Sequence, residues 1–333
     1  MGKVLVTGAT GFIGSAICSA LAEKKGYELV ALVRSNKGNP SIQCDDKIVG
    51  ELSSSFKWPE TLTVDCVIHC AGRAHVLADA ASNPLAEFRK VNVDGTLALA
   101  TEAASAGVKR FIFISSIGVN GSETHAAAFS EASDPAPNAN YALSKLEAEV
   151  ALLELQKTTA MEVVIIRPPL VYGAEAPGNF ERLLKIVHSG VPLPFSGVRN
   201  ARSMVALENL VDFIIHCIDH PAAANQIFLV SDGQDLSTEE IIRNLGAGMG
   251  RSKVRLLPYS DTLMRLGARF IGRLGLYSQL YGSLQIDSSK SCHLLGWRPV
   301  TCPQNALIRA GRDYKQRRKA NLAGKRKLNG ELS

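Results

Sequence analysis

Short apolar runs alternate with amphipathic segments through the first half of the chain. The runs are KVLVTG (3–8), ELVALV (28–33), CVIHCAG (66–72), RFIFISS (110–116) and VVIIRP (163–168). They are apolar on both faces, as strands covered by helices on both sides are. The segments between them carry apolar residues at helical spacing. This alternation predicts βαβ units and an α/β fold with a doubly wound parallel sheet.

A glycine-rich turn follows the first of these runs. Gly8, Gly11 and Gly14 stand where the strand passes into a predicted helix. In such a turn the first glycine permits a tight bend, the second lets backbone amides approach a pyrophosphate, and the third lets the helix pack closely. A phosphate then lies at the positive end of the helix. The turn therefore predicts a Rossmann-type dinucleotide site.

The alternation ends after RPPLVYG at 167–173, and one more strand-like run, FLVSDG, appears at 228–233. We therefore expect a dinucleotide-binding domain over residues 1–170, with its sheet completed by segments near 203–232. Residues 171–202 and 233–310 are expected to form a smaller α/β substrate lobe that is interleaved with this domain.

The formal net charge of +6 arises at the C-terminal end of the chain. Residues 311–333 contain eight Lys and Arg and two acidic residues, whereas basic and acidic residues are equal in number over residues 1–310. A balanced body gives no electrostatic footprint for nucleic acid. We expect the basic end to be a flexible tail, with weak contact to anionic lipid headgroups as the alternative to simple solvation.

No apolar run is long enough to span a bilayer. The seven cysteines include no CxxC pair, so neither a disulfide framework nor a metal site is predicted. We expect a cytoplasmic protein.

A hydroxyl, a phenol and an ammonium group stand at related positions. Ser115 and Ser116 follow the RFIFI strand. Tyr141 and Lys145 lie four residues apart at the start of a predicted helix, where their side chains share one face. A nearby ammonium favours the phenolate, so we expect the pKa of Tyr141 to fall; about three units require about 4 kcal/mol. Such a phenol acts as an acid or base near neutral pH.

With these motifs the chain resembles the extended short-chain dehydrogenase/reductase family. The likeness rests on TGATGFIG (7–14), YALSK (141–145), RPPLVYG (167–173) and QIDSSKSCHLLGWRP (285–299), and it extends to about residue 310. It implies NAD or NADP, nucleotide-sugar substrates, and a homodimer formed by the Tyr141 helix and the helix after Ser82. It also implies that Ser116 binds the reacting oxygen, Tyr141 exchanges its proton, and Lys145 holds the nicotinamide ribose.

The resemblance assigns further residues to the cofactor: Gly8, Thr10, Gly11, Phe12, Ile13, Gly14, Arg34, Glu51, Leu52, Ala71, Gly72 and Asn92, beside Tyr141 and Lys145. Arg34 stands about 20 residues beyond the turn, where an acidic residue usually binds the ribose of NAD. A cation at this place suits the 2′-phosphate of NADP. The sequence therefore favours NADP(H) over NAD.

Two residues of the substrate lobe fall where nucleotide-sugar members of the family bind the substrate diphosphate. These are Asn179 and Arg202, which we expect to bind substrate together with Ser116. An arginine suits this task because its fork matches phosphate oxygens. For the arginine that holds the nucleotide in related epimerases, Arg273 is the nearest candidate.

The residues after Ser116 bear on the reaction. Dehydratases of the family carry Asp-Glu there, whereas this chain has Ile117 and Gly118, which cannot move a proton. With dehydration disfavoured, the reaction expected of this site is the interconversion of an alcohol and a ketone by hydride transfer. SSIGVNG, VPLPF and YGSLQIDSSK resemble a bacterial subgroup linked to surface polysaccharide. We expect reduction of a UDP-4-keto-6-deoxy-N-acetylhexosamine at C4, with a UDP-glucose or UDP-GlcNAc type 4-epimerase holding NAD tightly as the alternative. A non-catalytic NADP-binding sensor is a distant alternative, because Tyr141 is intact.

Overall fold

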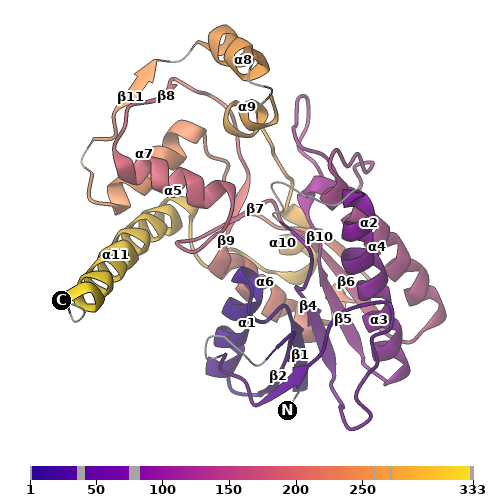
Figure 1. The fold of residues 1–333 in the computed structure, drawn as a ribbon. Coiled ribbons are helices and arrows are strands. Elements are labelled where there is room, and N and C mark those ends of the chain that lie inside the picture. Colours follow the sequence, from indigo (N-terminus) through magenta and orange to yellow (C-terminus); the bar gives the residue numbers. More distant parts are fainter. Residues whose placement is uncertain are drawn as a thin grey trace.

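A seven-stranded parallel sheet forms the centre of the molecule (Figure 1). The computed structural model describes residues 2–35, 42–74, 83–251, 253–258, 260–270, 272 and 274–330. The sheet has the order β10-β6-β5-β4-β1-β2-β3. Its strands are β1 (Gly2–Thr7), β2 (Tyr27–Val33), β3 (Asp46–Val49), β4 (Cys66–His69), β5 (Arg110–Ile114), β6 (Glu162–Arg167) and β10 (Ile227–Leu229). This is the strand order of dinucleotide-binding sheets with one strand added.

Helices cover both faces of this sheet. α1 (Phe12–Glu23) and α6 (Leu207–Asp219) lie on one face, and α3 (Gly95–Ser105) and α4 (Asn140–Thr158) lie on the other. Along β1, Val4 and Val6 pack into the core under α1 and α6, while Leu5 packs into the core under α3 and α4. Successive strand residues thus fill two separate cores, which is why the runs are apolar throughout. The doubly wound α/β prediction is confirmed.

The part of the chain expected to bind substrate forms a lobe with its own core above the sheet. Two small sheets pair β7 (Leu170–Tyr172) with β9 (Met204–Ala206), and β8 (Leu193–Ser196) with β11 (Leu256–Pro258). Its helices are α5 (Asn179–Ser189), α7 (Thr238–Gly248), α8 (Asp261–Phe270) and α9 (Leu274–Tyr281). The helix α10 (Ser289–Leu295) and the short turn η3 (Pro221–Ala223) pack beside β10.

The segment near 203–232 is divided between the two parts of the molecule. It supplies α6 and β10 to the sheet domain, and β10 pairs with β6. By contrast, β9 pairs with β7 outside the main sheet. The chain therefore completes the seven-stranded sheet only after it has built the first part of the lobe.

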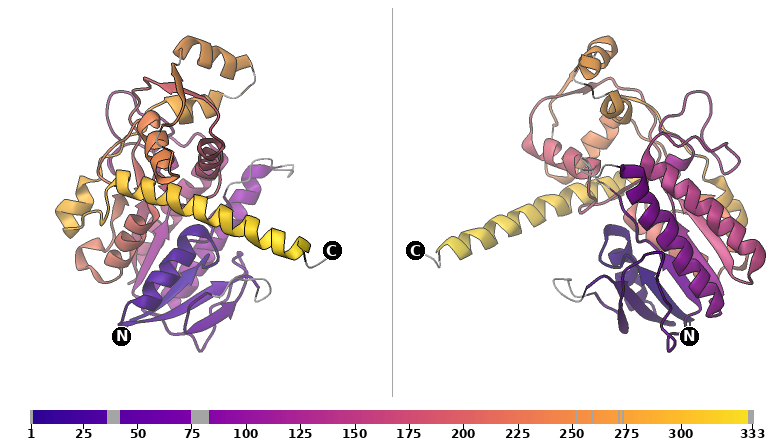
Figure 2. Two further views of the ribbon diagram at one scale, coloured as in Figure 1. Left: turned by 90° about the vertical axis from the view of Figure 1, so that its left-hand side faces the viewer. Right: turned by 45° about the vertical axis from the view of Figure 1, so that its right-hand side comes forward.

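The basic C-terminal segment differs from the expectation. Residues 311–330, expected to form a flexible tail, continue the helix α11 (Pro303–Gly330), which projects from the body in Figure 2. Ala306, Leu307, Ala310 and Tyr314 recur at helical spacing and are buried against the lobe core. Lys, Arg, Gln and Ala are strong helix formers, so the helix continues beyond the buried stripe.

Glycines allow α7 and α11 to cross closely. A Cβ on Gly248 would lie 1.9 Å from the carbonyl oxygen of Ile308, and one on Gly311 would lie 2.3 Å from that of Leu245. Real Cβ atoms do not tolerate such distances, so this crossing holds the first part of α11 in place.

Candidate active site

The glycine turn has the geometry that the sequence predicts. Gly8 has φ of +66°, and a Cβ there would lie 2.7 Å from the amide nitrogen of Ala71. A Cβ on Gly14 would lie 2.2 Å from the carbonyl oxygen of Gly8. The Gly11 amide donates to the Gly8 carbonyl over 2.8 Å, and the Ser15 amide bonds back to the Gly11 carbonyl. Because α1 begins at Phe12, the amides of residues 12–14 form the open, positive end of the helix.

Three predicted cofactor residues lie at the carboxyl ends of neighbouring strands. Arg34 directly follows β2 and is exposed, and Glu51 follows β3 and is also exposed. Leu52 is half-buried and packs over Gly95, where a Cβ would lie 3.3 Å from the Leu52 carbonyl oxygen. Since β1, β2 and β3 are adjacent and parallel, these residues share one edge of the sheet with the glycine turn.

Asn92 joins the loop after β4 to α4. Its side chain is fully buried; Oδ1 accepts from the Arg73 amide over 2.7 Å, and Nδ2 donates to the Arg73 carbonyl over 3.1 Å. Nδ2 also donates to Ser144 Oγ over 3.0 Å. A Cβ on Gly72 would lie 3.2 Å from Asn92 Oδ1 and 3.5 Å from Lys145 Nζ. Gly72, Asn92 and Lys145 therefore lie in one cluster.

The backbone around Asn92 is a π-helical turn, η1 (Lys90–Asp94), between α2 (Pro84–Arg89) and α3. Such turns are rare and are frequent at functional sites. The turn places Asn92 on the buried side, facing α4.

His69 was not predicted as part of the site. It ends β4, is buried, and its Nδ1 lies 2.7 Å from Thr7 Oγ1 while its Nε2 lies 2.9 Å from Thr96 Oγ1. Thr7 Oγ1 also accepts from the Ala71 amide over 3.2 Å. Burial lowers the pKa of His69 to about 3, and the Lys145 charge acts in the same direction. A neutral His69 thus ties β1 and the Ala71 loop to α3.

The two serines after β5 have different surroundings. Ser116 is half-buried, and its Oγ accepts from the Gly118 amide over 3.1 Å at the start of the turn η2 (Ile117–Val119). Ser115 is 3% exposed and its Oγ donates to the carboxylate of Glu149. Only Ser116 is placed near the surface of the site, which agrees with its assignment in preference to Ser115.

Ser116 lies beside the first turn of α4. A Cβ on Gly118 would lie 3.3 Å from Ser116 Oγ and 3.2 Å from the Cβ of Ala142. Lys145, one turn further along, donates from Nζ to the Ile114 carbonyl over 2.9 Å. Ile114 and Ser116 both lie at the carboxyl end of β5. Ser116 and Lys145 therefore both lie where the carboxyl end of β5 meets the start of α4, the helix that also carries Tyr141.

The pKa values of the phenol and the ammonium differ from the expectation. Burial raises the pKa of Tyr141 to about 12, whereas we expected it to fall. The Lys145 ammonium lies 6.0 Å from the centre of the Tyr141 ring and 4.4 Å from that of Phe113. Burial also lowers the pKa of Lys145 to about 8, although Cys70 and Glu149 act to raise it. Desolvation therefore has a larger effect on these two pKa values than the attraction between the two groups.

A buried ion pair supports this end of the sheet. Arg167 and Glu149 are both almost fully buried, and Nη2 of Arg167 lies 2.6 Å from Oε2 of Glu149. Arg167 Nη1 also donates to Asn120 Oδ1 over 3.1 Å. Glu149 in turn accepts from Ser115. These contacts connect α4, β6 and the turn after β5 directly beneath Ser116.

The predicted substrate residues reach the same stretch of the lobe. Asn179 is exposed and donates to Gln279 Oε1 over 2.6 Å. Arg202 is half-buried and donates from Nη1 to the Gly282 carbonyl over 3.3 Å. Burial lowers the pKa of Arg202, and the charge of Glu123 acts to raise it. Arg273 lies outside the described residues.

A search for known relatives then identifies the family. Residues 4–231 match the NAD dependent epimerase/dehydratase family. The chain belongs to this family.

One relative is similar over nearly the whole length. It is a UDP-glucose 4-epimerase from Vibrio cholerae, 42% identical over 321 residues, which cover 94% of this chain and 96% of the relative. Two solved structures of this fold are more distant in sequence. A UDP-N-acetylglucosamine 4-epimerase from Bacillus cereus has a TM-score of 0.76 at 18% identity, covering 95% of this chain and 100% of that one. A UDP-glucuronic acid 4-epimerase from Bacillus cereus in complex with NAD has a TM-score of 0.74 at 21% identity, covering 95% and 99%.

The residues of this NAD dependent epimerase/dehydratase fit a dinucleotide. The contacts of Gly8 and Gly14 leave no room for side chains where a pyrophosphate approaches the start of α1. Gly72 likewise keeps the loop after β4 open above Lys145. Among the described residues, no three His, Cys, Asp or Glu side chains are grouped to hold a metal ion. No helix in the described ranges is both long and apolar enough to cross a membrane.

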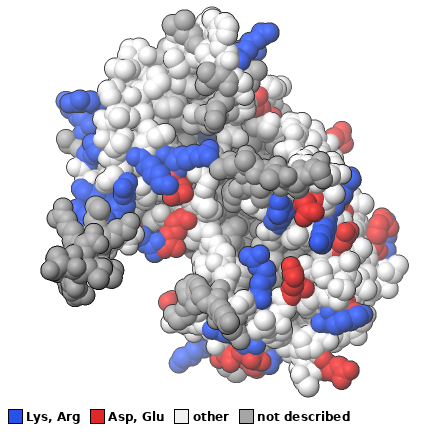
Figure 3. All heavy atoms as spheres, viewed as in Figure 1, with Lys and Arg blue, Asp and Glu red and all other residues white. Residues whose placement is uncertain are grey.

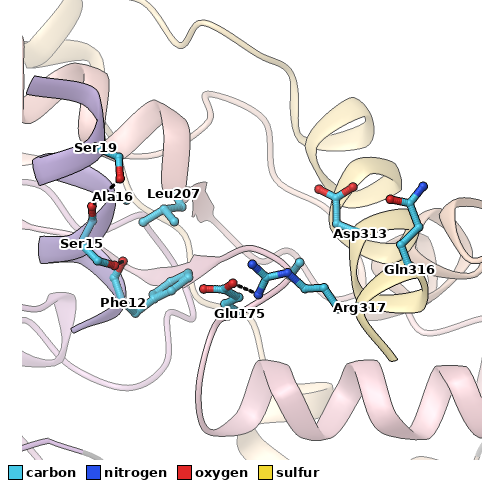
Figure 4. Close-up of a pocket in the computed structure, with 10 residues that line it drawn as sticks. Phe12, Ser15, Ala16, Ser19, Glu175, Leu207, Asp313, Gln316 and Arg317 are labelled. Atoms are coloured by element: carbon cyan, nitrogen blue, oxygen red, sulfur yellow. Dashed lines mark hydrogen bonds and ion pairs between the residues drawn. The ribbon is translucent and has the colours of Figure 1, made fainter. Parts of the chain in front are cut away.

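This family member also has a groove beside α1, the helix that follows the glycine turn. It has a volume of about 460 Å³ and runs between α1 and α11, with Ser15, Ala16 and Ser19 on one wall and Asp313 and Gln316 on the other (Figure 4). Arg317 and Glu175 form an ion pair across it. The Phe12 side chain lines this groove and also lies below Gly173, so it connects the glycine turn to the RPPLVYG segment. None of the three predicted catalytic residues lines the groove.

Proposed function

We propose that the protein interconverts the C4 epimers of a UDP-hexose or UDP-N-acetylhexosamine with NAD as its bound cofactor. The observations that carry this proposal are the bond of Lys145 to the Ile114 carbonyl at the carboxyl end of β5 and the place of Ser116 beside the first turn of α4, the turn that carries Tyr141. The likeness to the Vibrio cholerae UDP-glucose 4-epimerase over 94% of the chain supports epimerisation over other reactions of such a site.

The proposed mechanism assigns one task to each residue. A bound NAD, which the glycine turn would hold, would supply the hydride acceptor and donor for C4, and the keto sugar would turn over in the site between the two transfers. Ser116 Oγ holds the C4 oxygen, and Tyr141 takes the proton from this oxygen and later gives it back. Lys145 is oriented by the Ile114 carbonyl and, in its ammonium form, favours the phenolate of Tyr141. Gly72 leaves room for the Lys145 ammonium, and Asn92 bonds to Ser144, the neighbour of Lys145 on α4.

The substrate diphosphate is assigned to the lobe. Asn179 contacts Gln279 and Arg202 contacts Gly282, so both side chains reach the stretch 279–282 from different elements. The pairing of Arg202 with Leu236 and Leu284 through backbone bridges fixes its position. Because a guanidinium has a fixed fork of donors, Arg202 is suited to a phosphate.

Dehydration is not supported by the turn after Ser116. Ile117 is buried and Gly118 packs against Ala142, so neither supplies an acid or a base. Reduction at C4, which the sequence analysis favoured, is the second proposal. The observation in its favour is the exposed Arg34 at the end of β2, a place suited to the 2′-phosphate of NADPH.

We further propose a homodimer in which α2 and α4 pack against the same helices of a second copy. These two helices lie side by side, and Arg89 and Glu147 form an ion pair between them.

The test uses the purified protein with UDP-glucose and with UDP-GlcNAc, analysed by chromatography and NMR. The expected products are UDP-galactose and UDP-GalNAc, formed without net consumption of added NADH or NADPH. In D₂O, C4 of the product is expected to retain protium, because the hydride returns from the cofactor. Stoichiometric oxidation of NADPH with a 4-keto substrate would instead establish the reductase, and a 4-keto-6-deoxy product would refute both proposals.

The cofactor preference gives a separate prediction. If Arg34 binds the 2′-phosphate, Arg34→Ser should weaken NADPH binding about tenfold and leave NADH binding within about twofold, since a charge-assisted bond contributes about 1.5–3 kcal/mol. Fluorescence titration of both cofactors measures this. Arg73, in the loop after β4, provides the matched control as Arg73→Ser. Equal losses for both cofactors would show that Arg34 does not select between them.

A further inference from the structure

The helix α8 presents an apolar face to solvent. Leu266 and Phe270 lie four residues apart, so they share one side of the helix, and they are 48% and 82% exposed. Met264 and Ala268 are half-buried on the side that faces the molecule. Leu257, on the preceding strand β11, is 51% exposed. Leu266 and Phe270 are thus not used to attach α8 to the rest of the lobe.

The same region carries basic charge without acidic partners. We define the cap as residues 253–281, which contain five Lys and Arg and one acidic residue. Lys253, Arg255, Arg265 and Arg269 are exposed, and none of them forms an ion pair within the described part of the chain. Elsewhere in the lobe, Lys185 and Arg243 are paired with Glu181 and Glu239, whereas the exposed Arg182 and Arg199 form no ion pair within the described residues.

The cap lies at one extremity of the molecule. In Figures 1 and 2, α8 is the element farthest from the sheet domain, at the opposite end from the N-terminus. Figure 3 shows basic side chains on the rim of this end of the lobe. A flat surface could therefore contact α8 without meeting the sheet domain.

We propose that the cap docks on an anionic lipid surface, with Leu266 and Phe270 in the headgroup layer and Arg265 and Arg269 against lipid phosphates. Arg265 and Arg269 flank the exposed Leu266 and Phe270 on the helix surface, so apolar and basic side chains would meet a membrane interface together. Basic residues without acidic partners are attracted to anionic lipids. An uncharged or zwitterionic partner would use the apolar face but would leave this excess of positive charge without a complement.

Docking through the cap would place the substrate site next to the membrane. α9 follows α8 in the chain, and its Gln279 binds Asn179, while the residues just after α9 bind Arg202. The surface that touches lipid is therefore connected to the proposed diphosphate residues by a single helix. Product would be released close to membrane-bound enzymes that consume activated sugars.

The experiment is co-sedimentation of the full chain with vesicles of phosphatidylcholine and phosphatidylglycerol, compared with phosphatidylcholine alone. We expect binding only to the anionic vesicles and a loss of binding as salt is raised. Leu266→Gln with Phe270→Gln, and Arg265→Gln with Arg269→Gln, should each reduce binding at least tenfold. Thermal melts should be unchanged, because these side chains are exposed.

Two control variants separate the cap from other surfaces. Ile186→Gln removes an exposed apolar residue of α5, and Arg243→Gln removes an exposed basic residue of α7; both should bind as the parent does. Lys325→Gln, Arg326→Gln and Lys327→Gln together remove the distal charges of α11. Loss of binding in this last variant with retention in the cap variants would overturn the proposal, as would equal binding to both vesicle types or to neither.

Discussion

Tyr141→Phe is expected to lower turnover by a factor of about 10²–10⁴, the usual contribution of a positioned acid or base. The phenylalanine keeps the edge contact with Phe88, whose ring centre lies 6.2 Å from that of Tyr141, so α4 should pack as before. Cofactor affinity should change less than twofold, because the phenol acts on the substrate oxygen. Steady-state rates and a cofactor titration measure the two quantities separately.

Tyr27→Phe is the matched control for Tyr141→Phe. It removes a phenol that donates to Asp219 at the far end of β2, and it should leave turnover unchanged. Near-normal turnover in Tyr141→Phe would mean that another group moves the proton. Unchanged biological activity together with lost turnover would favour the non-catalytic sensor.

Arg167→Met is expected to destabilise the folded protein by about 3–5 kcal/mol, as breaking a buried ion pair does. The substitution leaves Glu149, which is 1% exposed, without its cationic partner. It also removes the hydrogen bond that Asn120 Oδ1 accepts from Arg167 Nη1. Urea unfolding at neutral pH, followed by circular dichroism, measures the change in the free energy of unfolding.

A second variant tests whether the unpaired charge causes the loss. Adding Glu149→Leu to Arg167→Met should recover part of the stability, because a buried ion pair is often replaced by apolar residues at little cost. Arg89→Met, which breaks an exposed pair with Glu147, should cost less than about 1 kcal/mol. If the double variant is no more stable than Arg167→Met alone, the unpaired charge of Glu149 is not the cause of the lost stability.

The sheet domain could be predicted from sequence because its signals are local. Six of the seven strands contain a short apolar run, whereas the edge strand β3 (DKIV) does not and was not predicted. Gly8, Gly11 and Gly14 stand at fixed offsets from the end of β1. Ser116, Tyr141 and Lys145 followed from the same logic, because strand ends and helical spacing fix where such side chains lie. That these three residues act as one catalytic set stays a prediction.

Other parts depend on contacts between distant segments. The pKa of Tyr141 is set by how much water the folded protein excludes, which spacing along a helix does not reveal. The pair of Glu149 and Arg167 joins residues from two elements, although the position of Glu149 one turn after Lys145 was a signal for a buried carboxylate on α4. The basic composition of the C-terminal segment predicted a flexible tail, although the spacing of Leu307, Ala310 and Tyr314 is that of a buried helix face.

The position of β10 in the chain constrains how the protein can be assembled. This strand lies beside β6, yet it is made only after β7, β8 and β9 have been translated. A nascent chain or proteolytic fragment ending at residue 170 would leave β6, whose central residues are fully buried in the complete protein, as an open edge available for aggregation. The sheet therefore closes late in synthesis, and recombination between relatives can exchange the lobe only as two separate inserts.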